Sequence, residues 1–242
     1  MVIPNTVKEF RDNSFLVEKI MNRLKSLQSF VGAKAISIAG QGPKFFKQNA
    51  KENYAAPFVY GLKGRVFSAV ETLQLIIDKH GLVKPKIAIV GVGEIGYSII
   101  ECLEKKGLRA EGIDIKIRKS GVGMEFTDGG SEKLKNADVV LVHTPQGDDF
   151  IEYYELLKES AILVDDSHPR ITSPPTTFQF YKVAIGKEGV EFSPPLPGYH
   201  NKWIPGCVQE SIVASSTCQF EVDQESFNEI SKKFGFFAYL VQ

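Results

Sequence analysis

The residues with the clearest chemical potential form a glycine-rich loop, Gly91-Val-Gly93-Glu-Ile-Gly96. An apolar run at 86–90 precedes the loop, and apolar residues recur at helical spacing through 94–106. A buried strand, glycines at this spacing and a helix are the context in which the pattern binds the diphosphate of a dinucleotide. The sequence therefore predicts a dinucleotide-binding strand–helix–strand unit.

Each position of the loop has a physical role in such a site. Gly91 permits the tight turn out of the strand, Gly93 lets the backbone approach the diphosphate, and Gly96 lets the helix pack on the strand. The backbone N–H groups at the positive end of the helix, with Glu94 and Ile95 in its first turn, then hold the phosphates.

Asp114 ends a second predicted strand at 110–115 and is the candidate ligand for the adenosine ribose. A carboxylate there accepts hydrogen bonds from the ribose hydroxyls, which favours NAD. Arg118 and Lys119 follow and offer the charge that a 2′-phosphate needs, although we favour the alternative that they are a plain surface charge pair. Asp114 also reads as a solvated strand end. The predicted cofactor is therefore NAD or NADP.

Two more apolar runs, at 137–142 and 161–165, predict further strands, with a helix at 150–158 between them and another strand near 179–185. Strands that alternate with helices predict a doubly wound parallel sheet of the Rossmann type, in the α/β class. Ligands of such sheets bind at the carboxyl ends of the strands. The loops at 143–147 and 165–170 are therefore expected near the nicotinamide.

These two loops supply further candidate residues. Thr144 and Pro145 are predicted to contact the cofactor, and His143 and His168 are candidates for proton transfer. Both histidines also fit a structural role as hydrogen-bonded loop residues. Asp165 and Asp166 are predicted either to contact ribose hydroxyls or to cap a helix. These six candidate residues each end or follow a predicted strand: His143, Thr144, Pro145, Asp165, Asp166 and His168.

The chain is predicted to have three parts: an N-terminal α/β lobe with a linker helix (1–81), the Rossmann domain (82–200), and C-terminal helices that return to the first lobe (201–242). The first part contains helical patterns at 7–29 and 44–53, a strand at 35–39, and a long helix that opens at Gly61-Leu-Lys-Gly64 and stops at Gly81. Lys44 and Lys63 border its turns, where they either bind an anionic substrate or remain solvated.

Cys207 is the most reactive candidate outside the glycine loop. It follows Pro205-Gly206 at the predicted start of a helix over 207–217, and a second helix is expected at 224–234. A helix N-terminus lowers the pKa of a thiol and favours a nucleophilic thiolate. Glu210 lies one turn further on. The alternative is that Cys207, like Cys102 and Cys218, is a small packing residue.

The composition excludes several classes of function. Lys and Arg number 29, as do Asp and Glu, so no charge excess indicates nucleic acid as a partner. No apolar stretch is long enough for a membrane span. Three cysteines without close spacing argue against a disulfide framework and against a zinc site, so no metal is predicted and a reducing, cytoplasmic location is expected.

Several of these segments together resemble a known family. They are a first-lobe strand ending near Gly40, the turns at 61–64 and 91–96, Leu163-Val-Asp-Asp-Ser-His-Pro169, and Gly206-Cys-Val-Gln-Glu-Ser211. The chain resembles the long-chain acyl-[acyl-carrier-protein] reductases and, more broadly, the shikimate-dehydrogenase-like two-lobed oxidoreductases. The resemblance implies that Cys207 accepts an acyl group from a thioester, with Glu210 beside it, and that NADPH-derived hydride then releases an aldehyde.

The residues themselves leave two other functions open. One is a dehydrogenase of a small hydroxy, keto or amino acid without covalent catalysis, in which His168 or a first-lobe lysine donates the proton. The other is a non-catalytic protein that senses NAD(P). The expected partner is a small-molecule or acyl-thioester substrate, and a homodimer is compatible with the two-lobed layout.

Overall fold

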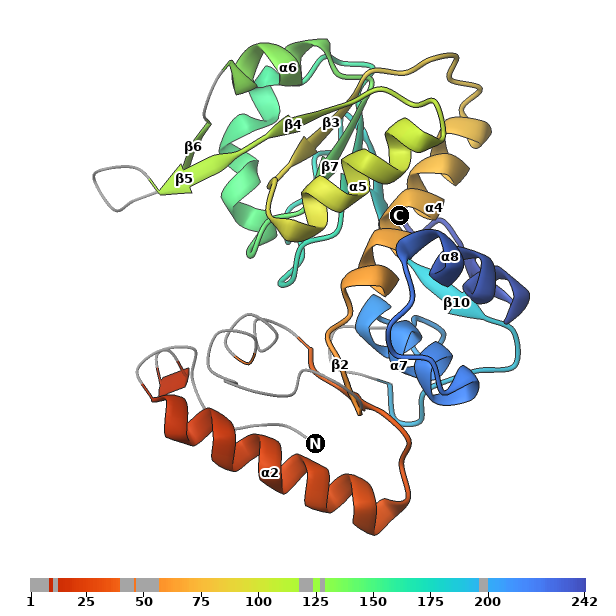
Figure 1. Cartoon of the computed structure of the whole chain (residues 1–242). Helices are drawn as coiled ribbons and strands as arrows, with labels where there is room; N and C mark the ends of the chain where they lie inside the picture. Colours follow the sequence, from red (N-terminus) through yellow and green to blue (C-terminus); the bar gives the residue numbers. More distant parts are fainter. Residues whose placement is uncertain are drawn as a thin grey trace. The chain divides into compact units, whose positions relative to one another are not determined.

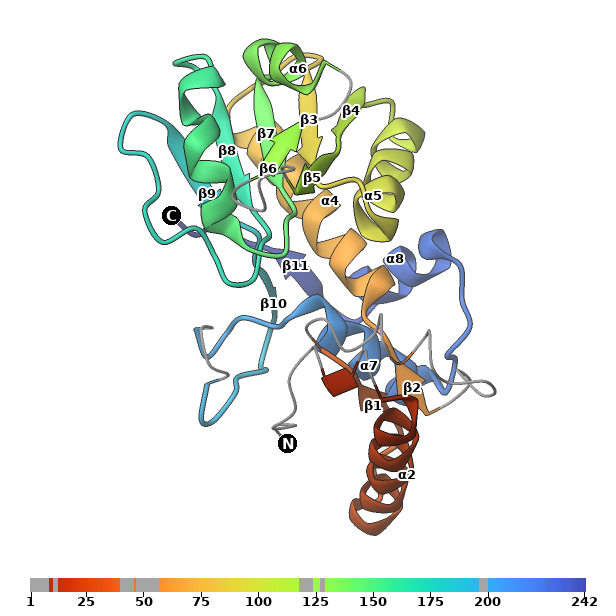
Figure 2. The ribbon, with the colours of Figure 1, turned by 90° about the vertical axis from the view of Figure 1, so that its left-hand side faces the viewer.

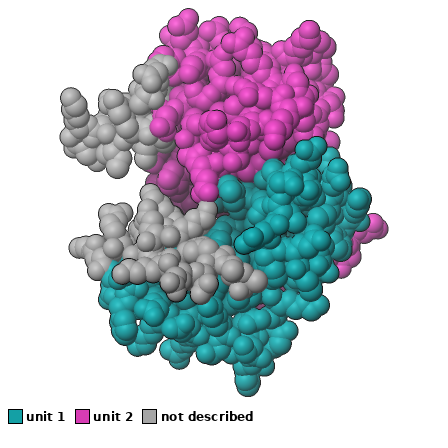
Figure 3. Space-filling model, in the orientation of Figure 1, with its two compact units in different colours: residues 1–65, 204–235 teal, residues 66–203, 236–242 magenta. Residues whose placement is uncertain are grey.

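The structure is a computed structural model and describes residues 9–10, 13–39, 46, 57–117, 124–126, 129–195 and 200–242. The chain, drawn as a ribbon in Figure 1, forms two compact units, which Figure 3 shows in different colours. Unit 1 contains Met1–Arg65 and Ile204–Gly235, and unit 2 contains Val66–Trp203 and Phe236–Gln242. The domain limits predicted after residues 81 and 200 stay predictions, whereas the contacts divide the chain after residues 65, 203 and 235.

Unit 2 is built on a five-stranded parallel sheet with the order β4-β3-β7-β8-β9, which Figure 2 shows with the strands side by side. Its strands are β3 (Ile87–Val90), β4 (Ala110–Ile113), β7 (Val139–Val142), β8 (Ile162–Asp165) and β9 (Gln179–Lys182). All four pairings are parallel. Every residue of β3, β7 and β8 is buried, which is why these strands read as continuous apolar runs in the sequence. The predicted Rossmann-type α/β fold is confirmed.

The register of the sheet brings the carboxyl ends of its strands to one edge. Val90 pairs with Ile113 and with Val142, and Val142 pairs with Asp165. The residues that follow these four positions are therefore neighbours along the edge, although they are far apart in the sequence.

Helical segments precede β3 and connect the later strands of unit 2 up to β8. They are α4 (Leu62–Lys79), whose first turn lies in unit 1, α5 (Glu94–Lys105), α6 (Gly130–Asn136) and the 3₁₀ segment η1 (Gly147–Leu156). The helix predicted at 150–158 is therefore correct in place but not in type. The buried residues of η1 are Gly147, Phe150 and Tyr153, and their spacing of three matches the 3₁₀ period.

Short strands complete unit 2. β5 (Ile115–Ile117) and β6 (Met124–Phe126) form an antiparallel pair, as do β10 (Ile185–Lys187) and β11 (Phe236–Ala238). The strand predicted at 110–115 is thus divided between β4 and β5, and the one near 179–185 between β9 and β10. Trp203 is buried.

Unit 1 contains α2 (Ser14–Val31), the parallel pair β1 (Ile36–Ser37) and β2 (Phe58–Val59), α7 (Gly206–Thr217) and α8 (Gln224–Lys233). The Asn13 side chain accepts a hydrogen bond from the Leu16 N–H and caps α2, and Gly32 ends that helix with φ 67°. The helix predicted at 44–53 lies outside the described residues, except for the helical and buried Phe46. In the described part of the chain, no helix combines the length and the apolar character needed to cross a membrane.

The tightest packing in unit 1 joins the start of α4 to the start of α7. A Cβ atom placed on Gly64 would lie 1.8 Å from the Gly206 carbonyl oxygen, and one on Gly61 would lie 2.4 Å from the Cys207 Cβ. Gly61 also has a φ of 75°, which L side chains rarely adopt. The glycines that open the long helix are therefore explained by packing against the segment that contains Cys207.

This contact predicts a large cost for Gly64→Ala. The methyl group would overlap backbone that cannot move aside, and overpacking of this kind lowers the free energy of unfolding by about 1–3 kcal/mol or more. Chemical denaturation of the purified variant measures it. Glu101→Ala on the exposed side of α5 is the control and should stay within about 0.5 kcal/mol of the parent. Equal stability of the two variants would contradict the packing described here.

Candidate active site at the carboxyl edge of the sheet

Two glycines of the loop between β3 and α5 are required by the fold itself. Gly91 has a φ of 97°, and a Cβ there would lie 2.2 Å from the carbonyl oxygen of His143. A Cβ on Gly96 would lie 2.2 Å from the carbonyl oxygen of Gly91. The roles predicted for these two residues, a tight turn and close helix packing, agree with this geometry.

Gly93 differs from both. Its backbone angles, φ −81° and ψ −167°, suit any residue, and a Cβ there would meet nothing within 4 Å. It is the N-cap of the 12-residue helix α5, a position where a polar side chain normally satisfies the first N–H groups. The fold therefore does not require glycine at this position. A glycine does leave room for an anion to approach the N-terminus of α5, so the residues present fit a diphosphate.

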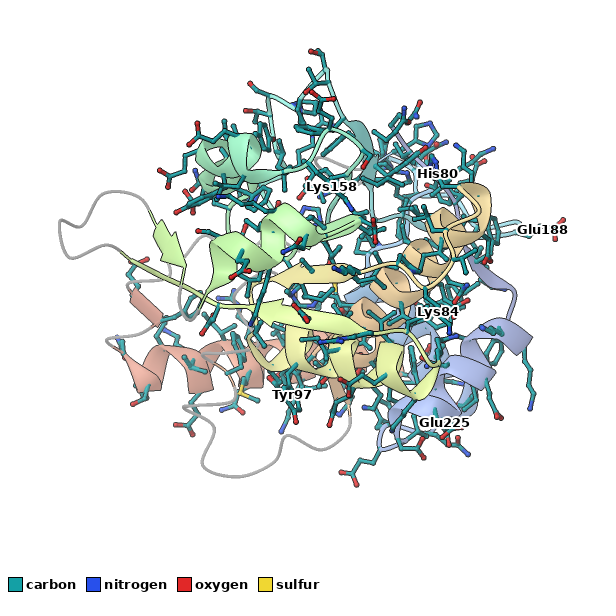
Figure 4. All side chains as sticks on the ribbon, turned by 90° about the horizontal axis from the view of Figure 1, so that it is seen from above. His80, Lys84, Tyr97, Lys158, Glu188 and Glu225 are labelled. Atoms are coloured by element: carbon teal, nitrogen blue, oxygen red, sulfur yellow. The ribbon has the colours of Figure 1, made fainter. Side chains whose placement is uncertain are left out.

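The surroundings of the loop are consistent with a dinucleotide. Asp114 is exposed directly after β4, the strand beside β3. Tyr97 follows Gly96 and points outward from α5, with 59% of its surface exposed (Figure 4). Arg118 and Lys119, the candidates for a 2′-phosphate, lie outside the described residues.

The sheet reverses its winding direction between β3 and β7. The chain proceeds from β3 to β4 on one side and returns to place β7 on the other side of β3. Such a switch point creates the crevice in which ligands of open α/β sheets bind. The His143 N–H donates to the Val90 carbonyl (2.8 Å), so His143 lies at the switch point and against Gly91.

His143 forms a dyad with Asp166. Its Nδ1 lies 2.8 Å from Asp166 Oδ2, and the two side chains are 14% and 12% exposed. An ionised carboxylate only accepts hydrogen bonds, so Nδ1 carries the proton and Nε2 of the neutral ring is the acceptor. The sequence placed both residues after strands, but their pairing depends on β7 and β8 being neighbours.

Asp165 does not have the ribose-binding or helix-capping role predicted for it. It is fully buried, and its carboxylate accepts hydrogen bonds from the N–H and Oγ of Ser167, from the Ile171 N–H (3.0 Å) and from Lys182 Nζ (3.0 Å). Lys182 was not among the sequence candidates. A lysine at the end of a strand gives no sequence signal of burial, because its partner is set by the pairing of β8 with β9.

The other predicted residues of these loops have different environments. Thr144 is buried, and its hydroxyl donates to the Gln146 carbonyl (2.8 Å), whereas Pro145 is exposed. His168 is exposed in the loop after β8. Contact of Thr144 and Pro145 with a cofactor, and proton transfer by His168, stay predictions.

Cys207 and Glu210 lie in unit 1, in the first turns of α7. Cys207 is at the helix start, as predicted. Burial raises the pKa of its thiol, although Ser37 and the charge of Arg65 act in the opposite direction. Desolvation thus outweighs the groups that favour a thiolate.

Glu210 joins α7 to the start of α4. Its Oε2 accepts from the Gly64 N–H (3.0 Å), and its Oε1 lies 3.8 Å from Lys63 Nζ. Both Lys63 and Glu210 line a hollow of about 480 Å³ in unit 1, whose other walls are largely apolar. A catalytic role of Glu210 and an anion-binding role of Lys63 stay predictions, and Lys44 lies outside the described residues. No group of residues suited to a metal ion occurs among the described residues.

No protein-family model and no curated protein matches the sequence. A D-lactate dehydrogenase with NAD⁺ from Lactobacillus jensenii is similar in structure at 16% identity and a TM-score of 0.34, over 64% of this chain and 54% of that chain. A D-isomer-specific 2-hydroxyacid dehydrogenase in complex with NAD from Lactobacillus delbrueckii ssp. bulgaricus has 15% identity and a TM-score of 0.32 (53% and 54%).

An NADPH-dependent glyoxylate/hydroxypyruvate reductase from Sinorhizobium meliloti is similar at 15% identity and a TM-score of 0.33, over 49% of this chain and 58% of that chain. The chain thus spans little more than half the length of these three enzymes. At these levels of identity and TM-score, their activities do not transfer to this chain.

The burial of Cys207 predicts the order in which the three cysteines react. The exposed Cys218 should be alkylated first by iodoacetamide, the half-buried Cys102 later, and Cys207 last, because burial raises the pKa of the last two thiols and only the thiolate reacts. Alkylation of Cys207 should accelerate as the pH rises toward its raised pKa. Peptide mass spectrometry over a pH series measures this, and selective labelling of Cys207 near pH 7 would contradict it.

Proposed function

We propose that this chain is an NAD(P)-dependent oxidoreductase whose chemistry takes place at the carboxyl edge of the unit 2 sheet. One observation carries the proposal: Gly93 leaves open space at the N-terminus of α5 that the fold does not require, beside the switch point that holds the His143–Asp166 dyad. A site for a diphosphate and a site for proton transfer thus occupy one edge.

The cofactor is assigned to the glycine loop. The backbone of residues 91–96, including the N–H groups of Glu94 and Ile95, would hold the diphosphate, and the exposed Asp114 would accept hydrogen bonds from the adenosine ribose, which favours NAD over NADP. When bound, the nicotinamide supplies or accepts a hydride.

The dyad is assigned the proton that accompanies the hydride. His143 Nε2 is the acceptor of the neutral ring, so it takes the proton of a substrate hydroxyl in oxidation and returns it to a carbonyl oxygen in reduction. Asp166 fixes the tautomer and stabilises the imidazolium that forms. This chemistry suits a small hydroxy or keto acid, or a related amino acid, without a covalent intermediate.

Thioester reduction through Cys207 is the competing proposal. Its support is the position of Cys207 in the first turn of α7 and the family resemblance of the sequence. Burial, which raises the pKa of the thiol, weighs against it, because the attacking species is the thiolate. The third function, non-catalytic sensing of NAD(P), shares the cofactor loop but requires no proton transfer.

The variant Gly93→Ser distinguishes what the fold requires at this position from what cofactor binding requires. Serine is a preferred N-cap, so the variant should be as stable as the parent or more stable. Its side chain would occupy the space assigned to the diphosphate, so the Kd for NADH should rise by about tenfold or more. Thermal unfolding measures the stability, and fluorescence titration measures the affinity for each nucleotide. The parent should bind NADH more tightly than NADPH.

Gly129→Asn is the matched control for that substitution. Gly129 is also an N-cap glycine, of α6, and lines a hollow with Lys86 and Arg109 next to the starts of β3 and β4. Its φ of 71° is one that Asn tolerates. NADH affinity should be unchanged in this variant. Undiminished NADH binding by Gly93→Ser would remove the main support for the proposed cofactor site.

His143→Gln distinguishes the catalytic proposals. Loss of the proton-transfer group should lower kcat for a small hydroxy or keto acid by about 10²–10⁴-fold, while the Kd for NADH changes little. Cys207→Ser should retain most of that activity. The reverse pattern, with an acyl adduct on Cys207 detected by intact-protein mass spectrometry, would favour thioester reduction, and NADH binding without turnover of any carbonyl or thioester would favour a sensor.

A further inference from the structure

Among the described residues of unit 2 is a buried lysine that the proposed chemistry does not use. Lys182, the last residue of β9, is 4% exposed. Its Nζ donates to Asp165 Oδ2 (3.0 Å) and to the Ser167 carbonyl (2.7 Å). A lysine so deeply buried requires partners that compensate for the loss of water, so both contacts are part of the reason for its position.

These contacts hold the two residues on either side of Asp166. Asp165 receives hydrogen bonds from Lys182, from the N–H (2.9 Å) and Oγ of Ser167, and from Ile171. The Asp166 N–H itself donates to the Val142 carbonyl (2.9 Å). The backbone of Asp166 is therefore fixed before, at and after the residue, with one buried ammonium group at the centre of the network.

The position of the Asp166 carboxylate follows from this network. Its Oδ2 lies 2.8 Å from His143 Nδ1, and the His143 N–H in turn donates a hydrogen bond to the Val90 carbonyl. We propose that Lys182 is a positioning residue: through Asp165 and Ser167 it holds Asp166 in place and thereby keeps the proton of His143 on Nδ1 and Nε2 free to accept. Its effect on catalysis depends on the proposed function, whereas its effect on the histidine ring does not.

If the Lys182–Asp165 ion pair had only a structural role, the expected result would be different. Its removal would lower stability and leave the His143 ring as it was. A positioning role requires that the ring change, because a displaced carboxylate no longer selects the Nδ1-protonated tautomer. The ¹⁵N chemical shifts of the imidazole nitrogens separate the two tautomers. The chain has four histidines, so single His→Gln variants assign the signals.

The test compares Lys182→Met with Lys158→Met. Lys158 also pairs with an aspartate, Asp138, but its side chain is 33% exposed. Asp138 precedes β7 whereas His143 follows it, so the Lys158–Asp138 pair lies at the opposite end of that strand from the dyad. We expect the neutral His143 ring of the parent and of Lys158→Met to be protonated at Nδ1. In Lys182→Met both tautomers should be populated, and kcat should fall by up to about 10²-fold while the Kd for NADH is unchanged.

Two further variants keep the proposal testable if Lys182→Met does not fold. Ser167→Ala removes one hydrogen bond to Asp165 and leaves the ion pair, so it should shift the tautomers in the same direction by a smaller amount. Lys182→Arg retains the charge and should restore the parent ring signals. Unchanged ¹⁵N signals of the His143 ring in Lys182→Met would overturn the proposal, even if the enzyme still oxidises NADH. If Lys182→Met does not fold, unchanged signals in Ser167→Ala would overturn it. Absence of NADH binding by the parent would instead overturn the proposed function and leave the ring result valid.

Discussion

Close packing of backbone on backbone at the end of β3 is the constraint on which the candidate site depends. The absent side chain of Gly91 allows the His143 carbonyl to approach, and the Gly91 carbonyl in turn packs where Gly96 has no Cβ. A side chain at either position would separate β7 or α5 from the end of β3. The N-terminus of α5 and the dyad therefore share one edge because three backbone segments meet without intervening side chains.

Two consecutive aspartates at that edge have different environments, because β8 ends between them. Asp165 is the last residue of β8, a strand buried along its whole length, whereas Asp166 is the first residue after the strand and pairs with His143 at the edge of the sheet. The interior carboxylate is tolerated because an ammonium group and three other donors surround it. The end of β8 therefore contains one aspartate, Asp165, whose carboxylate is surrounded by donors inside the protein, and the next residue, Asp166, orients the His143 ring through a hydrogen bond.

Much of unit 2 could be predicted from the sequence because its signals are local. Buried parallel strands are continuous apolar runs, and the glycine loop has a fixed spacing with a strand before it and a helix after it. Pairings between distant residues have no such signal. Neither the His143–Asp166 dyad nor the burial of Lys182 could be derived without the order β7-β8-β9, and the contact of Gly64 with Gly206 needs the position of α7.

Burial also affects the two candidate reactive groups, the Cys207 thiol and the His143 imidazole, in different ways. A thiol becomes a nucleophile by ionising, and an apolar environment opposes that step, so the close packing that seats Cys207 against Gly61 weakens the case for it as a nucleophile. An imidazole can act as a base in its neutral form, and partial burial beside a carboxylate fixes its tautomer without requiring a resting charge on the ring. Helix position alone made Cys207 the stronger candidate in the sequence, whereas solvation, which depends on tertiary packing, favours His143.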